Sequence, residues 1–392
     1  MGHSLVSLDA RLRRRDQALR PPMTLSPLNR RRLHNFRRNR RGYVAFWVFL
    51  VMFFASMASE FICNDRPLFV SYHGEWLFPV FVNYPEDKFG GFEAVTDYRD
   101  PVISQEIDAH GFIIWPPIRF ANNTTKLDPP TPLPSPPTWS LSEAQCKAAL
   151  AAHPPAKPPE PGEACRALEP EWLGTDANGR DVVARLFYGF RISVLFGLIL
   201  AGVSSVVGVA AGAVQGYFGG RTDLIMQRGI EIWSSLPQLY ILIILSALLS
   251  PSFWVLLTIL LLFSWVGLVH VVRAEFLRAR NFEYVNAARA LGLGDFKIII
   301  KHVLPNAMVA TLTFATFIVN ASIGALTSLD FLGLGMPPGS PSLGELLFEG
   351  KDNLSAPWLA LSAFFIVATM LSLLVFIGEA VRDAFDPRKT FR

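Results

Sequence analysis

Six apolar stretches, each of about twenty residues, constrain the fold of this chain more than any other feature of its sequence. They cover residues 43–62, 192–214, 230–249, 254–272, 307–327 and 358–377, and Pro237 interrupts the third. A helix of this length spans the hydrocarbon core of a bilayer. Hydrophobic residues make up 51% of the chain and charged residues only 17%, which is typical of a membrane protein. The sequence therefore predicts an all-α membrane protein with six transmembrane helices and both termini on the same side.

The positions of the basic residues predict which side that is. Residues 1–42 contain twelve arginines against Asp9 and Asp16, and the loop 273–306 and the tail 381–392 are also basic. The positive-inside rule assigns these segments to the cytoplasm. The N-terminal tail could also bind anionic lipid or nucleic acid, but we interpret it as a topology signal and expect no nucleic-acid partner. A charged leader of about forty residues is too long for a signal peptide, so an uncleaved first transmembrane helix is predicted over residues 43–63.

The long segment between the first two helices, residues 64–185, is predicted to lie outside the cytoplasm. It holds seventeen acidic and ten basic residues. Aromatic and aliphatic residues at 76–82 and 112–117 predict a small β-containing subdomain. Proline is frequent from 128 to 162, which favours a stiff linker over a polyproline recognition motif. The remaining residues, 186–380, are predicted to form the transmembrane core.

Two of the three cysteines lie in this segment at a spacing that suits a disulfide. Cys146 and Cys165 are nineteen residues apart on the side of the membrane that is predicted to be oxidising. A disulfide between them would close a loop and contribute about 3 kcal/mol. Cys63, at the membrane boundary, is left over.

The loop 273–306 contains a run of small residues that suggests a contact surface. If the residues from Asn286 form a helix, Ala288 and Gly292 lie four positions apart on one face that has almost no side-chain bulk. Gly292 and Gly294 permit a sharp turn, and Pro305 suits the first turn of the next helix. A docking site for another protein and an ordinary loop helix are both compatible with this pattern.

Polar residues inside the predicted spans are candidates for a translocation path, because burying them in lipid is costly. Most of the serines and threonines in these spans are explained by hydrogen bonds to their own helices. Glu231 and Asn320 have no such explanation, and Pro237 breaks the span that contains Glu231. We therefore expect Glu231, Pro237 and Asn320 to belong to a water-filled path.

Motifs of enzyme chemistry are not found in the sequence. It contains no Gly-x-x-x-x-Gly-Lys-Ser/Thr phosphate loop and no nucleophile elbow. The seven histidines show no paired spacing with cysteine or a carboxylate that would indicate a metal site. The chain is not expected to carry catalytic residues, to hydrolyse ATP itself or to hold a cofactor or metal.

Residues 286–305 resemble the cytoplasmic "EAA" loop in permeases of ABC-type dipeptide and oligopeptide importers. Further motifs that are similar to this family occur in the family's order at 173–193, 328–344, 356–358 and 382–388, so that the resemblance covers residues 170–392. N-terminal motifs at 39–43, 89–91, 97–101 and 115–120 look like a subgroup, the Yej-type permeases. That subgroup is associated with the uptake of oligopeptides and of the peptide-nucleotide antibiotic microcin C.

The resemblance implies a transport function in which this chain does no bond chemistry. A second homologous permease would complete the channel, and a periplasmic binding protein would deliver the peptide. Two ATPase subunits would bind ATP and Mg and push on the loop 283–305. The chain would lie in the lipid of the bacterial inner membrane, with residues 64–185 in the periplasm and both termini in the cytoplasm. The ATPase-coupling residues implied are Asn286, Ala287, Ala288, Gly292, Gly294, Leu304 and Pro305.

One departure from the family motif affects this expectation. Asn286 stands where the family has glutamate, so steric fit rather than charge is expected to carry the coupling. Two other functions remain alternatives. An ion-coupled secondary transporter would need an intramembrane ion relay and usually internal repeats, and neither is visible. A membrane protein whose periplasmic domain carries the function is the other alternative.

Overall fold

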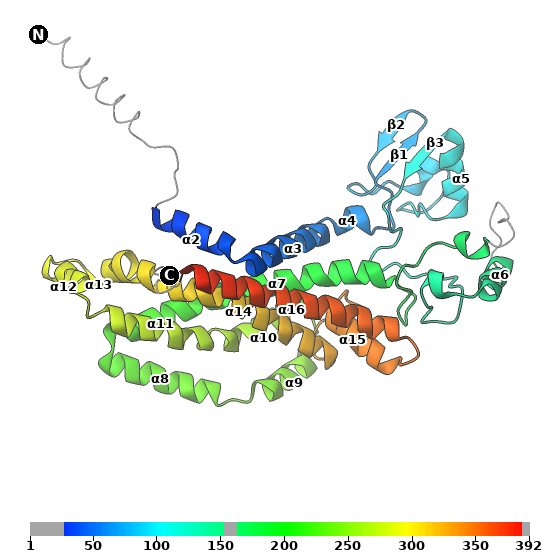
Figure 1. The fold of residues 1–392 in the computed structure, drawn as a ribbon. Helices are drawn as coiled ribbons and strands as arrows, with labels where there is room; N and C mark the ends of the chain where they lie inside the picture. Colours follow the sequence, from blue (N-terminus) through cyan, green and yellow to red (C-terminus); the bar gives the residue numbers. More distant parts are fainter. Residues whose placement is uncertain (1–26, 153–162, 386–392) are drawn as a thin grey trace, which may run out of the picture.

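The computed structural model describes residues 27–152 and 163–385. The basic tail up to residue 26, residues 153–162 of the proline-rich linker and the C-terminal tail from residue 386 lie outside the described residues. The described residues form a bundle of long helices, and a small unit of strands and short helices lies at one end of it (Figure 1).

Five helical stretches of the described residues are long and apolar enough to cross a membrane. They are Arg40–Met57 (α3), Val182–Phe218 (α7), Phe253–Ala279 (α10, Phe253–Ser264, and α11, Val266–Ala279), Asp295–Phe331 (α13, Asp295–Ile298, to α14, Leu304–Phe331) and Pro357–Phe385 (α16). A sixth candidate consists of α8 (Gly220–Ser234) and α9 (Gln238–Leu248), which are bent by 64° relative to each other. Pro237 immediately precedes α9 and has no N–H to continue the helical hydrogen bonding, which explains the break. The predicted all-α membrane class is confirmed, with six spans when the bent pair counts as one.

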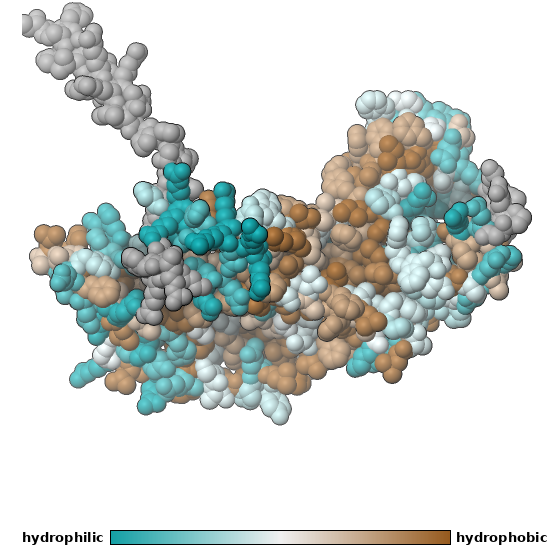
Figure 2. Space-filling view, in the orientation of Figure 1, coloured by the Kyte–Doolittle hydropathy of each residue, from teal (hydrophilic) through white to brown (hydrophobic). Residues whose placement is uncertain are grey.

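The bundle has two distinct ends, which we call the hairpin end and the sheet end. At the hairpin end α12 (Glu283–Ala290) and α13 form a helical hairpin, and α2 (Pro27–Arg38) and the end of α16 lie towards the same end (Figure 1). Arg32 of α2 lies over the ring of Phe385, 4.4 Å from its centre. The sheet end carries α4 (Ser59–Ile62), α15 (Leu343–Asp352) and the unit between α4 and α7. Figure 2 shows hydrophilic surface over α2 and apolar surface on the neighbouring part of the bundle.

Three glycines on α7 bring this helix into close contact with α11. Gly208, Gly212 and Gly216 follow one another at four-residue intervals and are all buried. An added Cβ would lie 2.8 Å from the Cβ of Val272 at Gly212, and 2.6 Å from the backbone oxygen of Arg273 at Gly216. Small residues at this spacing allow two helices to pack backbone to backbone, as is common in membranes. The two helices therefore form one closely packed pair.

A three-stranded antiparallel sheet begins the unit at the sheet end. The strand order is β2 (Glu75–Leu77), β1 (Phe69–Tyr72) and β3 (Gly111–Ile114). A 3-10 turn, η1 (Glu86–Phe89), and the helix α5 (Pro101–His110) complete its core. The buried core residues are Val70, Tyr72, Leu77, Phe89, Tyr98, Ile103 and Ile107. The predicted β-containing subdomain is present, but its strands have only three or four residues and are a minor part of the fold.

A disulfide connects two of the short helices between the sheet and α7. The short helices are η2 (Thr138–Ser140), α6 (Glu143–Ala152) and η3 (Ala164–Arg166). Cys146 of α6 and Cys165 of η3 are bonded, with a Cα–Cα distance of 5.1 Å. Leu141 and Ala164 are buried against this pair. Cys63, the third cysteine, is free and buried at the end of α4.

Candidate coupling site and translocation path

The hairpin of α12 and α13 turns at a Schellman cap. Gly292 follows the end of α12 with a φ of +74°, in the left-handed region that favours glycine. The N–H of Leu293 donates to the carbonyl of Ala288 (3.2 Å), and the N–H of Gly292 donates to the carbonyl of Arg289 (2.9 Å). These bonds satisfy the last carbonyls of α12 and turn the chain towards α13. An added Cβ at Gly292 would meet nothing within 4 Å, so the backbone conformation, and not crowding, requires glycine here.

The predicted bare face of Ala288 and Gly292 is wrong, because Ala288 faces the bundle. Ala288 is only 4% exposed and packs with Val285, Ile298 and Val303 between the hairpin and the bundle. Val285 and Ala288 are three positions apart and therefore share one face of α12, and this face is turned inward. The small side chain of Ala288 lets α12 approach its own chain closely. It does not offer space to a partner.

The other predicted coupling residues occupy different positions around the hairpin. Gly294 is exposed and forms the N-cap of α13. Leu304 is half-buried against the hairpin core, and Pro305 lies in the first turn of α14. Proline cannot donate a hydrogen bond to the preceding turn, and the residues before it, Ile299–Val303, form a wider π-helical turn.

The outer side of the hairpin carries large apolar side chains. Leu291 is 81% exposed and Phe296 is 76% exposed, and Phe282 also reaches the surface. Asn286 and Ala287 lie on the exposed side of α12. We call these five residues the hairpin surface. Exposed apolar side chains that gather on a small protrusion indicate a contact with another protein.

Polar and covalent connections attach the hairpin to two long helices. The hydroxyl of Tyr217, near the end of α7, donates to Oδ1 of Asp295 at 2.7 Å. The guanidinium of Arg289 lies over the ring of Tyr217, 5.0 Å from its centre. On the other side, α13 continues through the π-helical turn directly into α14. The hairpin is therefore connected to both α7 and α14.

The residues that were predicted to line a translocation path lie on different elements. Glu231 on α8 is paired with Arg228, with 2.6 Å between Oε2 and Nη1, and both side chains are substantially exposed. Asn320 on α14 is half-buried, and its Oδ1 has no hydrogen-bond partner among the described residues. Pro237 lies at the break between α8 and α9.

A cavity of about 440 Å³ lies between α9, α10, α11 and α14. Its polar lining comes from Gln238, Ser264 and Ser322, and most of its other lining residues are apolar. Glu231 and Asn320 are not among the lining residues. Gln238 follows Pro237 directly, so the helix break brings a polar side chain to this cavity.

A buried ion cluster at the sheet end was missed by the sequence analysis. The guanidinium of Arg185, which is fully buried, lies 2.5 Å from Asp176, 2.6 Å from Glu349 and 3.1 Å from Glu345. Arg180 binds the same oxygen of Asp176 at 2.8 Å. Burial raises the pKa of Glu345 above its usual range. The cluster joins the loop before α7, the first turn of α7 and the first two turns of α15.

Two features of the sequence could have revealed this cluster. Arg185 lies inside the first turn of a membrane helix, where an unpaired charge is costly. Glu345 and Glu349 are four residues apart, which puts both carboxylates on one face of a helix. The partners come from segments that are far apart in the chain, so the sequence does not show that they meet.

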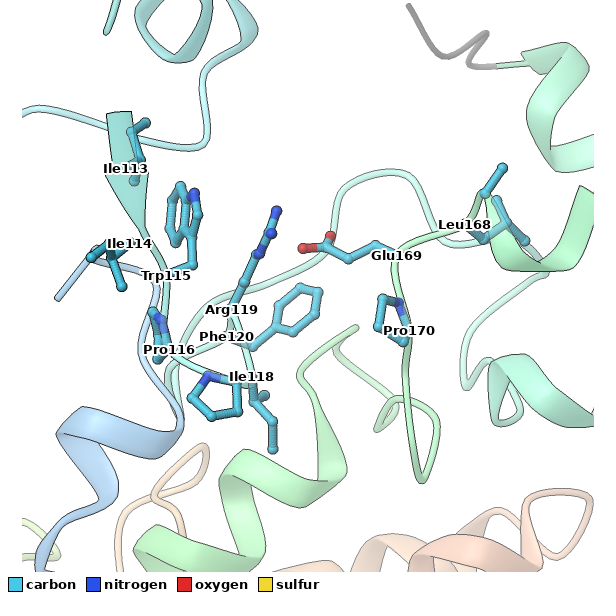
Figure 3. A pocket seen from close by; sticks show the side chains of 12 residues that line it. Ile113, Ile114, Trp115, Pro116, Ile118, Arg119, Phe120, Leu168, Glu169 and Pro170 are labelled. Atoms are coloured by element: carbon cyan, nitrogen blue, oxygen red, sulfur yellow. The ribbon is translucent and has the colours of Figure 1, made fainter. Parts of the chain in front are cut away.

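A second cavity, of about 740 Å³, lies in the unit at the sheet end. It is lined by residues 113–120 and 167–170. Figure 3 shows that the side chains of Arg119 and Glu169 point towards each other across it. Glu169 also pairs with Arg99 at 2.9 Å. The cavity thus offers a cation and an anion beside apolar lining residues.

The bundle, the hairpin and the comparison with known sequences identify the class of protein. The chain belongs to the family of binding-protein-dependent transport system inner membrane components, whose family model matches residues 204–391. It is 61% identical over 367 residues to the peptidoglycan transport system permease protein YejE of Agrobacterium fabrum, covering 94% of this chain and 95% of that protein. The inner membrane ABC transporter permease protein YejE of Escherichia coli is 54% identical over 93% of this chain and 98% of its own length. The dipeptide transport system permease protein DppC of Bacillus subtilis is 41% identical over 220 residues, which cover 55% of this chain and 68% of that protein.

Family membership decides between the functions that the sequence left open. The chain is a transport permease of the inner membrane, and not a catalytic subunit. The two alternatives, an ion-coupled secondary transporter and a membrane protein whose extracytoplasmic domain alone carries the function, are excluded by this membership. The predicted resemblance to ABC importer permeases is confirmed.

Proposed function

We propose that this chain is the permease subunit of an ATP-driven importer of peptides, and that an ATPase subunit binds the hairpin surface. The observation that carries this proposal is the hairpin itself. It is a protrusion that is capped at Gly292 and anchored by buried residues, with Leu291 and Phe296 exposed at its tip. The apolar tip would bind the ATPase subunit, and the rigid base would transmit force from that subunit to the bundle. ATP and Mg are then bound by the ATPase subunits and not by this chain.

The hairpin end is the cytoplasmic end in this proposal. The basic helix α2 and the end of α16 lie towards the hairpin, and positive charge favours the cytoplasmic side. Both termini are then cytoplasmic, and the unit at the sheet end lies in the periplasm. A periplasmic binding protein delivers the substrate there.

A second permease subunit covers α8 and α9 in this proposal. This bent pair exposes large apolar residues along its length, among them Ile225, Ile232 and Tyr240. The path for the substrate lies where the two subunits meet, and Glu231, Pro237 and Asn320 belong to it. The cavity with Gln238 contributes the part of this path that a single chain forms.

The proposed substrate is a peptide, and microcin C-like peptides are included in this class. Relatives of this chain are named for the transport of peptidoglycan and of dipeptides, which share peptide bonds. The 740 Å³ cavity presents Arg119 and Glu169, which suit the two charged ends of a short peptide. It is a candidate entry site on the periplasmic side.

The test uses charged substitutions at the hairpin surface. Leu291→Glu and Phe296→Glu leave the core intact because both side chains are exposed, and we expect them to abolish co-purification of the ATPase subunits and peptide uptake by membrane vesicles. Leu354→Glu is the matched control, since Leu354 is 84% exposed in the loop after α15, at the sheet end. It should retain the ATPase. If both hairpin variants keep a complete, active transporter, the proposed contact is refuted.

A further inference from the structure

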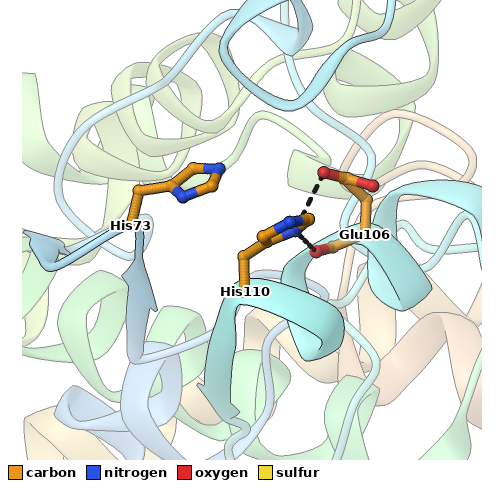
Figure 4. A group of neighbouring side chains, drawn as sticks. All are labelled: His73, Glu106 and His110. Atoms are coloured by element: carbon orange, nitrogen blue, oxygen red, sulfur yellow. Dashed lines mark hydrogen bonds and ion pairs between the residues drawn. The ribbon is translucent and has the colours of Figure 1, made fainter.

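Two histidines and a glutamate meet on the surface of the unit at the sheet end (Figure 4). His73 lies in the turn between β1 and β2, and Glu106 and His110 lie on the last turns of α5. One potential ligand atom from each side chain lies within 4.8 Å of the others. The helical spacing of Glu106 and His110 is visible in the sequence, but only the fold brings the distant His73 to them.

We propose that His73, Glu106 and His110 bind a zinc ion. Two imidazoles and one carboxylate are a ligand set that zinc uses in proteins. Imidazole nitrogen favours zinc and related transition metals over calcium and magnesium, which prefer oxygen ligands. Three protein ligands leave one position of a tetrahedral ion free for water or for a group from another protein.

The distances fit this ion after small side-chain movements. Two ligand atoms on one tetrahedral zinc ion lie about 3.3 Å apart, because each bond is about 2.0–2.1 Å long. Nδ1 of His110 and Oε1 of Glu106 are already 3.1 Å apart. The largest distance between two of the three ligand atoms is at most 4.8 Å, so it must shorten by at most about 1.5 Å. His73 and His110 are exposed, so rotations about their side-chain bonds are free to make this change.

The backbone holds the two histidines close together. The N–H of His73 donates to the carbonyl of His110 at 3.4 Å. An added Cβ at Gly111 would lie 1.8 Å from the carbonyl oxygen of Ser71, so only glycine lets the end of α5 approach β1 this closely. As a result, the centres of the two imidazole rings are 4.5 Å apart.

A tight turn holds the backbone of His73 next to the end of α5. The φ of His73 is +48°, and Gly74 after it has a φ of +81°. This two-residue turn usually has asparagine, aspartate or glycine in its first position. Histidine is one of the few residue types other than glycine that adopt a positive φ readily, so this turn holds His73 without strain.

A neighbouring side chain orients the carboxylate. The hydroxyl of Tyr72 donates to Oε1 of Glu106 at 3.2 Å, and the ring of Tyr72 is buried in the core of the unit. Hydrogen bonds of this kind fix metal-binding carboxylates, and their loss weakens binding by about 10- to 100-fold. Tyr72 is therefore a positioning residue for the proposed site.

The test is a zinc titration of the full-length protein without a polyhistidine tag. A chromophoric chelator competes for the metal, and cobalt(II) replaces zinc in a parallel experiment to report ligand geometry. We expect a zinc-binding site and an intense, tetrahedral cobalt spectrum. His73→Asn and His110→Ala should each weaken zinc binding at least tenfold, and Tyr72→Phe should weaken it about tenfold with the same cobalt spectrum. His34→Ala, at an exposed histidine of α2, should bind zinc as the wild type does.

His73→Asn separates a loss of ligand from a loss of structure. Asparagine suits the left-handed turn, so the metal-free variant should unfold at the same temperature as the metal-free wild type or slightly above it. Zinc should then raise the unfolding temperature of the wild type only. Equal zinc affinity of the wild type and a His73→Asn, His110→Ala double variant would overturn the proposal.

Discussion

Tyr217 and Asp295 are joined by a 2.7 Å hydrogen bond that connects the end of α7 to the first residue of α13. The same α7 is packed against α11 through Gly212 and Gly216. The hairpin is therefore hydrogen-bonded to the most closely packed pair of helices in the bundle. A single substitution at this contact can therefore disconnect the hairpin from α7.

Tyr217→Phe removes this hydrogen bond and keeps the ring that lies beneath Arg289. We expect the loss of one hydrogen bond to lower the free energy of unfolding by about 1 kcal/mol. The ATPase subunits should remain bound, but less peptide should be transported per ATP hydrolysed in proteoliposomes. Tyr188→Phe is the control, because it removes a hydroxyl that donates to Glu60 at 2.8 Å at the other end of α7. Equal transport per ATP in the two variants would refute this role of Tyr217.

Gly292→Ala tests the Schellman cap. The substitution meets no neighbouring atom, but its φ of +74° is unfavourable for a residue with a Cβ. We expect a cost of about 1–2 kcal/mol, seen as a lower unfolding temperature in detergent and weaker retention of the ATPase. Gly294→Ala is the matched control, since its φ is −68° and its surroundings are equally open. If the unfolding temperature falls equally in both variants, the positive φ is not the reason that glycine is required at position 292.

Arg185→Met tests the ion cluster. Methionine fills most of the space of the arginine stem but leaves Asp176 and Glu349 without their closest cation. Because breaking a buried pair leaves uncompensated charge, we expect a loss of about 3–5 kcal/mol and poor recovery of folded protein from membranes. Arg191→Met is the comparison, because Arg191 is partly exposed and lies 3.5 Å from Glu60. That variant should lose less than about 1 kcal/mol, and a similar loss in both would argue against a special role for the cluster.

Asp181 predicts a pH dependence of stability. Asp181 caps α7 by accepting the N–H of Ala184 at 2.8 Å, and burial raises its pKa from 3.8 to about 7. The folded protein thus binds this proton more tightly than the unfolded chain does. The resulting stabilisation is complete below about pH 4 and is lost as the pH rises towards 7. The unfolding temperature should therefore decrease from pH 5 to pH 7.5.

Asp181→Asn should flatten this decrease, because asparagine keeps the capping oxygen and cannot titrate. A residual slope of the same sign is expected from Glu171, whose pKa is also raised by burial. Asp100→Asn, at the cap of α5, is the control and should leave the slope unchanged. A wild-type slope that survives unaltered in Asp181→Asn would contradict the assignment.

The sequence predicted the class of fold and the break at Pro237, because both depend on local patterns. Apolar length identifies spans, and Pro237 predicted the interruption that is seen as the bend between α8 and α9. The face of α12 that carries Ala288 was predicted to be exposed to a partner, and this prediction was wrong. A short helix with valine and alanine on one side can present that side to a partner or to its own bundle, and only the tertiary packing of Ala288 against Ile298 decides.

The sites that were missed depend on contacts between distant segments. Arg185 meets Glu345 and Glu349 only after α15 folds back between α7 and α16. His73 meets His110 only after β1 pairs with β3. In both cases two residues of the site are four positions apart on one helix, which the sequence shows. The remaining residue comes from a distant segment and can be assigned only from the fold.

The length of α7 has a mechanical consequence. Its 37 residues make a rod of about 55 Å, against a hydrocarbon core of about 30 Å, so it extends beyond the membrane interior. Tyr217 near one end touches the hairpin, and Arg185 near the other end belongs to the ion cluster. A rigid tilt of this rod by only about 5° would displace one of these residues relative to the other by about 4 Å. A single helix therefore reaches from the hairpin end of the bundle to the sheet end, with no loop between Arg185 and Tyr217.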